Sequence, residues 1–524
     1  MKKTMKSFSM AALALVGAVM TSCSSDDLTE NNQQFAENNG NNVETLTASI
    51  SMAGGETRAL TSGGVKTFAE GDKIAVVYKN TSGETVKAES EELTGISVDG
   101  KSADFTVTLT NADKTQNVTY IYPAAMAEED GSVASISSQN GTLESLASNM
   151  DYCEFSGAWD GSDLPTGEMD NQLVICAFTL KDCLGTSDIT STITNMTVSD
   201  GTNTYNVTRE AAAGPIYVAI YPTSSKNINY TATSSTKFYA KYVTSKTYAA
   251  GSWHNIGLKM AEVIKGKFTV DKSGNKVFFS KGNLRATYIS SVWSWSFAPN
   301  QWSIIGNNSA NINITGNGTV SVGGAPVDLF GWSTSTTHLG IHNSTNNNVY
   351  RGEEFADWGS ASEVTAYIGT GWRSLNGGEW DYLLKDRTTT SGKHYCKAKV
   401  DGHFGVILLP DDWNTSYYNL QNCDVENLSF SDGALVGNII SLEVWNASFV
   451  PHGAVFLPTT GQREGATVTN ENGRLYYWSS TSGANTSGES ANANQMYIAG
   501  NAVSPNTGAG RHFGNAVRLV YPIK

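Results

Sequence analysis

The stretch TLTASISM, from Thr45 to Met52, alternates polar and apolar side chains along its whole length. This period of two predicts a β-strand with one buried face, because successive side chains of a strand point to opposite sides. The same pattern, broken by turn residues, returns in KIAVVYKN, DFTVTLT, VTYIYPAA, QLVICAFTL, IYVAIYP and TKFYAKYVT. We therefore predict a mainly β chain whose first half forms β-sandwiches.

The length of the chain requires more than one hydrophobic core. Its 524 residues are 40% hydrophobic and 16% charged, which supplies apolar surface for several domains. Loop-like sequence over residues 155–170 separates two stretches of sandwich size. We predict one sandwich over residues 43–160 and a second over residues 161–262.

The composition changes beyond residue 262. Ten of the twelve tryptophans and six of the seven histidines lie there, so residues 263–524 are predicted to form a different domain. FTVDKSGNKVFFS, residues 268–280, predicts an opening hairpin. Residues 378–387 predict a short helix, because their apolar side chains recur at helical spacing.

Residues 1–22 have the parts of an export signal peptide: early lysines, an apolar run from Met10 to Met20, and small residues before Cys23. The tetrapeptide MTSC resembles a bacterial lipoprotein signal, in which Cys23 becomes the acylated first residue; a plain secretory signal is the alternative. The CSSDD start resembles the surface-export signal of lipoproteins in Bacteroides-like bacteria. These resemblances imply a lipid anchor in the outer membrane, followed by a polar tether over residues 23–42.

Charge and cysteine usage exclude other classes. Without residues 1–22 the chain has 32 basic and 49 acidic residues, and such a surface repels phosphate backbones, so nucleic acid is not an expected partner. The remaining cysteines are scattered, without the spacing of a disulfide framework or a metal motif. We interpret them mainly as buried thiols: Cys153, Cys176, Cys183, Cys396 and Cys423.

The first half of the chain resembles the fimbrillin family of Bacteroides-type pilins. The resemblance rests on the order of GETRAL, FAEGDKIAVVYKN, YIYPA and YAAGSWHNIGLKM over residues 43–262. It implies two transthyretin-like β-sandwiches and assembly with other pilin subunits by β-strand addition. In that family a protease cuts after an arginine that follows the first strand, and Arg58 occupies the matching place. The alternative is that Arg58 is an ordinary loop residue and the first strand stays in place.

The last half resembles the C-type-lectin-like fold, in its formylglycine-generating-enzyme-like branch and in domains called Fibrobacter major paralogous. The motifs are WRSLNGGEWDYLL, YYWSS and GNAVRLV, although residues 374–377 depart from the helix motif of that branch. The resemblance implies an α+β domain with a C-type-lectin-like fold over residues 263–524.

The chemistry of that fold is not matched. The enzymes of the branch use a cysteine pair near the final strands, and residues 473–524 contain no cysteine. Calcium-dependent lectins use Trp-Asn-Asp, whereas the strings at Trp413 and Trp445 lack the final carboxylate. His338 and His342 are spaced as H-x-x-x-H in Gly-interrupted loop sequence, which chance explains better than a metal site. We expect no catalysis, cofactor or metal; an enzyme acting on glycans or sulfatases is the least favoured alternative.

Residues 480–512, STSGANTSGESANANQMYIAGNAVSPNTGAGRH, are the softest segment of this half. In lectin-like domains altered by diversity-generating retroelements, the variable ligand contacts lie in the closing segment. The resemblance therefore implies a binding face here; the alternative is a solvated loop region around one strand, QMYIAG. The candidate contacts are Asn485, Asn492, Asn494, Tyr497, Asn501, Asn506, His512, Phe513 and Asn515.

Together the patterns favour a surface-exposed lipoprotein adhesin, at the tip of a pilus, that binds a glycan or protein ligand through residues 263–524. The alternative from another class is a pilus anchor or surface scaffold with no ligand of its own.

Overall fold

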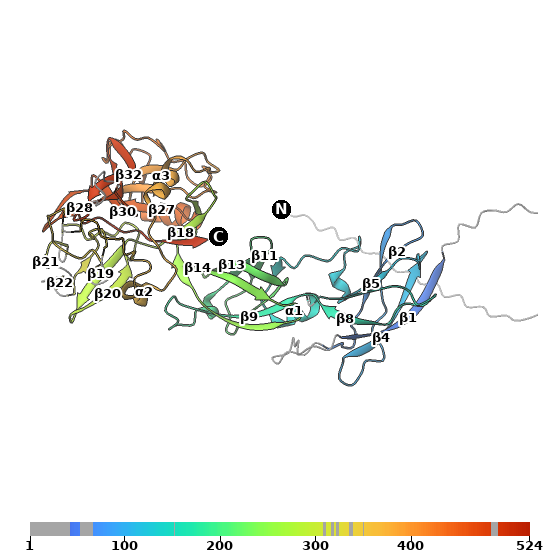
Figure 1. Ribbon diagram of the computed structural model, residues 1–524. Coiled ribbons are helices and arrows are strands. Elements are labelled where there is room, and N and C mark those ends of the chain that lie inside the picture. The colour runs from blue at the N-terminus through green and yellow to red at the C-terminus, as the bar shows by residue number, and fades with distance from the viewer. Residues whose placement is uncertain are drawn as a thin grey trace, which may run out of the picture. The chain divides into compact units, whose positions relative to one another are not determined.

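The computed structural model describes residues 42–52, 67–150, 152–307, 311–315, 319–320, 324–334, 339–348, 350–483 and 491–523. Cys23, Arg58, His338 and Asn485 lie outside these residues. The chain is 44% strand and 9% helix, which confirms the prediction of a mainly β protein. In Figure 1 the elements are coloured in chain order, from blue to red.

A seven-stranded sheet with the order β3-β2-β5-β7-β8-β1-β4 forms the first sandwich. Strand β1 pairs antiparallel with β4, from Ser51 opposite Ser102 to Val43 opposite Thr110, and parallel with β8 (Figure 1). Apolar side chains from both ends of this order share one core. The strands are β1 Val43–Met52, β2 Ala75–Lys79, β3 Thr85–Glu89, β4 Ser102–Thr110, β5 Val118–Tyr122, β7 Cys153–Gly157 and β8 Gly167–Asn171.

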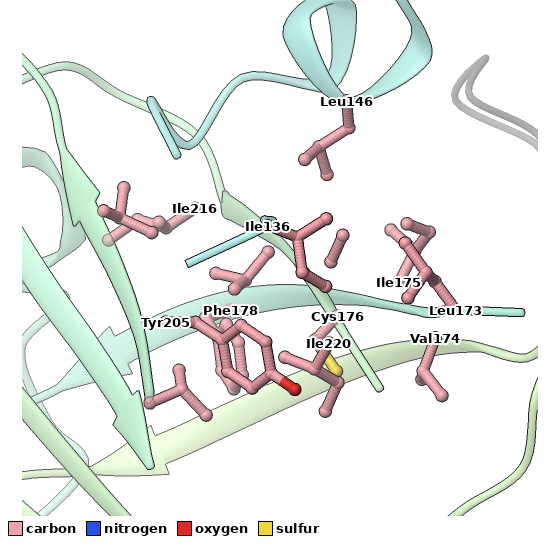
Figure 2. Close-up of a cluster of buried hydrophobic side chains, with 14 of the residues drawn as sticks. Ile136, Leu146, Leu173, Val174, Ile175, Cys176, Phe178, Tyr205, Ile216 and Ile220 are labelled. Carbon is pink, nitrogen blue, oxygen red and sulfur yellow. The ribbon is translucent and has the colours of Figure 1, made fainter. Parts of the chain in front are cut away.

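Two sheets enclose the core of the second sandwich. One has the order β16-β14-β13-β10-β11-β6, and the other has the order β12-β9-β15. Leu146 of helix α1 (Leu143–Asn149) points toward Ile136 in this core, as Figure 2 shows. The strands are β6 Ser138–Gln139, β9 Val174–Lys181, β10 Asn195–Ser199, β11 Thr204–Thr208, β12 Ile216–Ile220, β13 Thr223–Thr233, β14 Phe238–Tyr248, β15 Trp253–Lys259 and β16 Ala261–Val263.

The two cores do not divide at residues 160/161, where the sequence predicted a boundary. Ile136 and Leu146 lie in the second core, and β6 pairs with β11. The Gln139 amide donates to the carbonyl of Ala219 at 2.7 Å and accepts from its N–H at 2.9 Å. The chain then returns to the first sheet in β7 and β8. This crossing depends on long-range pairing, which local sequence patterns do not encode.

Residues 263–524, called here the C-terminal region, hold several small sheets. Strand β18 pairs with β33, so the predicted opening hairpin, β17 with β18, meets the end of the chain. The sheets have the orders β17-β18-β33, β20-β19-β23, β21-β22, β26-β24-β25-β27, β28-β29 and β30-β31-β32. The strands are β17 Phe268–Thr269, β18 Lys276–Phe279, β19 Leu284–Ile289, β20 Val292–Phe297, β21 Ile314–Thr315, β22 Thr319–Val320, β23 Pro326–Val327, β24 Tyr395–Val400, β25 His403–Leu408, β26 Ile439–Ile440, β27 Val455–Pro458, β28 Thr460–Glu464, β29 Thr467–Glu471, β30 Leu475–Ser482, β31 Asn492–Ala499, β32 Ala502–Gly510 and β33 Val520–Ile523.

The predicted helix is α3, Gly377–Lys385. It begins with a capping box: Glu379 N–H donates to Asn376 Oδ1, and Asn376 N–H donates to the Glu379 carboxylate, both at 2.8 Å. Arg373 also donates two bonds to this carboxylate, at 2.6 and 2.7 Å. The other helical segments are α2 Ser362–Ile368, α4 Leu442–Val444, η1 Ala124–Met126, η2 Thr190–Thr192, η4 Trp445–Phe449 and η5 Val450–His452.

Strand β16 joins the second sandwich to the C-terminal region. Val263 lies opposite Phe238 of β14 and also forms a bridge with Ser280. The Phe238 ring meets the Phe278 ring edge-on, with centroids 5.4 Å apart. A single apolar core therefore contains side chains from both sides of the junction: Ala240, Ala261, Val263, Phe278 and Tyr521.

The interpretation of the cysteines mainly as buried thiols does not hold for one pair. Cys396 of β24 and Cys423 form a disulfide that closes a sequence separation of 27. Cys153, Cys176 and Cys183 are not disulfide-bonded. Cys176 is fully buried, and that burial raises the pKa of its thiol to about 12, as expected for an inert core residue.

We predict that replacing both bonded cysteines by alanine (C396A/C423A) lowers the free energy of unfolding by about 2–4 kcal/mol, because the unfolded chain loses a loop constraint. Urea unfolding followed by tryptophan fluorescence tests this, since ten of the twelve tryptophans report on the C-terminal region. Cys183→Ala is the control and should barely move the midpoint. A wild-type midpoint that dithiothreitol leaves unchanged would contradict the prediction.

Candidate functional site

The segment predicted as soft loops is mostly strand. Residues 492–499 form β31 and residues 502–510 form β32, both paired antiparallel, and β31 also pairs with β30. The expected single strand, QMYIAG, is thus part of a longer hairpin. Helix α3 lies against β32 (Figure 1). Strand pairing satisfies the backbone N–H and C=O groups of this Asn-rich and Gly-rich sequence. The assignment as loop was based on composition, which does not show such pairing.

Four asparagines form what we call the amide row: Asn347, Asn492, Asn494 and Asn506. Asn347 Nδ2 donates to Asn492 Oδ1 at 2.9 Å, and Asn494 Nδ2 donates to Asn506 Oδ1 at 2.6 Å. Asn492 and Asn494 are two residues apart on β31, so they face the same side of the sheet. The row therefore places several amides along one strand face.

The N-terminus of α3 adjoins one end of the amide row. Gly377 N–H donates to Thr481 Oγ1 at 2.9 Å. A Cβ on Gly377 would overlap Oδ1 of Asn506, so the absence of a side chain there lets Asn506 approach the helix. Within the described part of the chain, Asn494 Oδ1 and Asn506 Nδ2 make no hydrogen bond. These two groups offer a ligand one acceptor and one donor.

The other end of the row contacts His512. The ring Nδ1 lies 3.3 Å from Asn347 Oδ1, and Nε2 lies 3.4 Å from the Glu464 carboxylate. Burial lowers the pKa of His512, and Glu464 opposes this shift only in part. The ring is therefore mainly neutral at pH 7. Phe513 is half-buried, with its ring 4.2 Å from the His512 ring.

Arg511 fixes the backbone beneath the row. Its guanidinium lies over the Trp332 ring, 4.3 Å from the centroid. It donates to the carbonyls of Tyr350 at 2.7 Å and Asn492 at 3.2 Å, and to Ser482 Oγ at 2.7 Å. These charge-assisted hydrogen bonds hold the segments of Tyr350, Asn492 and Ser482 in one geometry, and the stacking on Trp332 orients the guanidinium.

The structure separates the other predicted contacts from the amide row. Tyr497 lies opposite Tyr476, with ring centroids 5.1 Å apart, on the sheet face opposite to Asn494. Asn501 is exposed near the β31–β32 turn, where buried Lys397 donates to the carbonyls of Ala499 and Gly500 at 2.6 and 3.4 Å. Burial lowers the pKa of Lys397 to about 8.

Asn515 lies inside the protein rather than on a binding face. It is fully buried, receives a hydrogen bond from Gln462 and donates one to Gln495, at 3.0 and 2.7 Å. Asn515 thus ties β28 to β31. Asn515 lies beyond the soft segment, in the GNAVRLV motif, and the sequence around it does not indicate these two partners.

Sequence reasoning missed Asn347 and Glu464. Asn347 belongs to the run NSTNNN, residues 343–348, which is even richer in asparagine than the closing segment. That shared composition was the available signal. Only the fold shows that the two segments meet.

The chemistry of the row is that of recognition by neutral hydrogen-bonding groups. Among the described residues, no group of three or more His, Cys, Asp and Glu side chains could hold a metal ion. The tryptophans of the two incomplete lectin strings, Trp413 and Trp445, are buried core residues. Over the same residues, no helix has both the length and the apolar content needed to cross a membrane.

Comparisons with known proteins find only low sequence and structural similarity. No family model and no curated protein sequence matches the chain. One similar solved structure, from Bacteroides fragilis, is described as a "putative cell adhesion protein"; it is 12% identical, with a TM-score of 0.23, over 49% of this chain and 95% of its own. Another, from Bacteroides uniformis with the same description, is 13% identical, with a TM-score of 0.24, over 41% of this chain and 94% of its own.

We predict that Gly377→Ala displaces the Asn506 side chain and breaks its bond to Asn494, because the new methyl group overlaps Asn506 Oδ1. The fold should persist, with a stability change of about 1 kcal/mol or less, since a side chain can swing away and alanine favours a helix. A crystal structure of the variant measures the displacement. Gly508→Ala is the matched control, because a Cβ there meets nothing within 4 Å. An unmoved Asn506 would contradict the prediction.

Proposed function

We propose that this chain is a cell-surface lipoprotein adhesin that binds a glycan or protein ligand through the amide row of its C-terminal region. The observation that carries the proposal is the open pair of groups on Asn494 and Asn506, held on paired strands beside α3. Rigid strands lower the entropic cost of binding, and neutral amides suit hydroxyl and peptide groups. The Met1–Cys23 signal supports the surface location.

The first strand supports assembly into a pilus by strand exchange. Ala48 and Ile50 of β1 are buried in the first core, and β4 and β8 flank the strand. On its outer side, Thr45 and Thr47 pair with Thr108 and Thr106 through hydroxyls 3.0 Å apart. Loss of β1 would expose unpaired backbone and apolar pockets, which a strand from another subunit can fill. In this proposal, the large C-terminal region follows the two sandwiches and carries the ligand site, which favours a place at the pilus tip.

A non-binding pilus anchor or scaffold is the second candidate. The many hydrogen bonds that join β1 to β4 favour it, because a strand so fully paired leaves slowly without cleavage. The two candidates differ in two measurable properties: ligand binding at the amide row and the fate of residues 43–58.

We expect Asn494→Ala/Asn506→Ala to reduce adhesion of cells displaying the full-length chain about tenfold or more, because two central hydrogen-bonding side chains are lost. Adhesion is measured on a glycan array and on purified extracellular-matrix proteins. Asn419→Ala/Asn427→Ala is the control, since both asparagines are exposed in the same region and lie outside the row. Equal adhesion of the two double variants would rule out the amide row as the binding site.

We expect chains recovered from assembled pili to begin after Arg58, and Arg58→Ala to block their incorporation, because an uncleaved β1 occupies the groove that strand exchange needs. N-terminal sequencing and immunoblots of sheared pili measure both. Cys23→Ser is the companion variant and should release the chain from the membrane without changing its fold. Recovery of residues 43–58 from surface protein would favour the anchor or scaffold.

A further inference from the structure

A cavity of about 590 Å³ lies between the outer face of the six-stranded sheet and the C-terminal region. We call it the junction cavity. Its volume falls within the range of small-ligand pockets, about 300–1,000 Å³. No member of the amide row lines it. The shared apolar core around β14 and β16 fixes the two walls relative to each other.

One wall is a flat array of hydroxyl and amide groups. Thr197 of β10 lies between Asn206 of β11 and Thr231 of β13 in the register of the sheet. Thr197 Oγ1 donates to Asn206 Oδ1 at 3.0 Å. Asn195, Thr204 and Thr233 extend the array. Every one of these side chains is uncharged, and each can donate and accept hydrogen bonds.

The opposite wall carries an aromatic pair. The rings of Tyr417 and His452 are parallel to within 4°, with centroids 3.4 Å apart. Trp413 meets both rings edge-on, at 85° and 87°, and is itself buried and stacked on Phe449. Tyr417 is 37% exposed, and both residues of the pair line the cavity.

The helical segment that ends at His452 is irregular. The segment passes from α4 through a π-helical turn, η4, into the 3₁₀ turn η5. Irregular turns of this kind often occur at functional sites. Gly453 then adopts a φ of 74° and contacts Gly266, where a Cβ would overlap the Gly453 carbonyl oxygen. This contact holds Lys265 and Lys267 beside the aromatic pair.

The charged groups around the cavity all lie on the wall opposite the sheet. Lys265 and Lys267 line it together with Asp412, and the sheet wall contributes no charge. Burial and the nearby Lys265 lower the pKa of His452, so the ring is neutral at pH 7. A peptide strand is disfavoured, because a sheet face rather than a sheet edge lines the cavity. The uncharged Thr and Asn array and the aromatic pair favour a neutral molecule with many hydroxyl groups.

We propose that the junction cavity binds a neutral oligosaccharide, with one sugar ring on the Tyr417–His452 pair and its hydroxyls bonded to the Thr and Asn wall. A pyranose ring has an apolar C–H face and a polar rim. The aromatic pair matches the apolar face, and the Thr and Asn wall matches the polar rim. The site is separate from the amide row and requires both the second sandwich and the C-terminal region.

Calorimetric titration of the full-length chain with cellohexaose, chitohexaose and maltohexaose tests the proposal. At least one oligosaccharide should bind saturably. Tyr417→Ala should weaken that binding about tenfold or more, and Tyr417→Phe should have a much smaller effect because the ring remains. Thr197→Val/Thr231→Val should weaken it similarly from the opposite wall, in a strand context that valine favours.

Two controls define the site. Tyr367→Ala removes another exposed tyrosine, on α2 and away from the cavity, and should leave the affinity unchanged. Asn494→Ala/Asn506→Ala should also leave it unchanged. Tryptophan fluorescence checks that each variant is folded. No saturable binding to any of the three probes, unchanged affinity in Tyr417→Ala, or loss of binding only in the amide-row variant would overturn the proposal.

Discussion

The pairing of β16 with β14 is the constraint on which the arrangement of both candidate sites depends. Val263 lies at the end of the second sandwich's sheet and also bridges Ser280, so the chain has no free linker between the two. Ring contact between Phe238 and Phe278 extends the backbone connection into a buried core. The two regions therefore share one packed core rather than meeting only through the backbone. The second sandwich and the C-terminal region therefore present their walls to the junction cavity in a defined geometry.

A second pairing, β18 with β33, helps to hold the segment that carries the amide row in place. It fixes residues 520–523, and Arg511 is only nine residues earlier in the chain. Buried arginines complete the support, since each guanidinium bonds several segments at once. Arg387, for example, contacts the Asp411 carboxylate at 2.9 Å and the carbonyl of Leu383 at 2.8 Å. Removing one such group would leave buried acceptors unpaired, so its loss should destabilise the fold.

Sequence patterns predicted the features that depend on residues close together in the chain. The alternation in TLTASISM encodes the buried Ala48 and Ile50, and the helical spacing near Trp380 encodes α3. The features that were missed depend on residues far apart in the chain. Cys396 and Cys423 are brought together by β24 and a loop, and Gln139 reaches Ala219 across the second core. The amide row was predicted only in part for the same reason, because Asn347 joins it from a distant segment.

The low charge of the chain suits both proposed sites. At physiological ionic strength, attraction between exposed charged groups is largely screened beyond a Debye length of about 8 Å. A surface that relied on charge would lose affinity as salt rises, whereas amides, hydroxyls and aromatic faces bind through contacts that salt barely screens. These neutral groups are concentrated on the outer face of β10, β11 and β13 and along β31. The Thr and Asn side chains of these strands thus supply the recognition chemistry of both proposed sites.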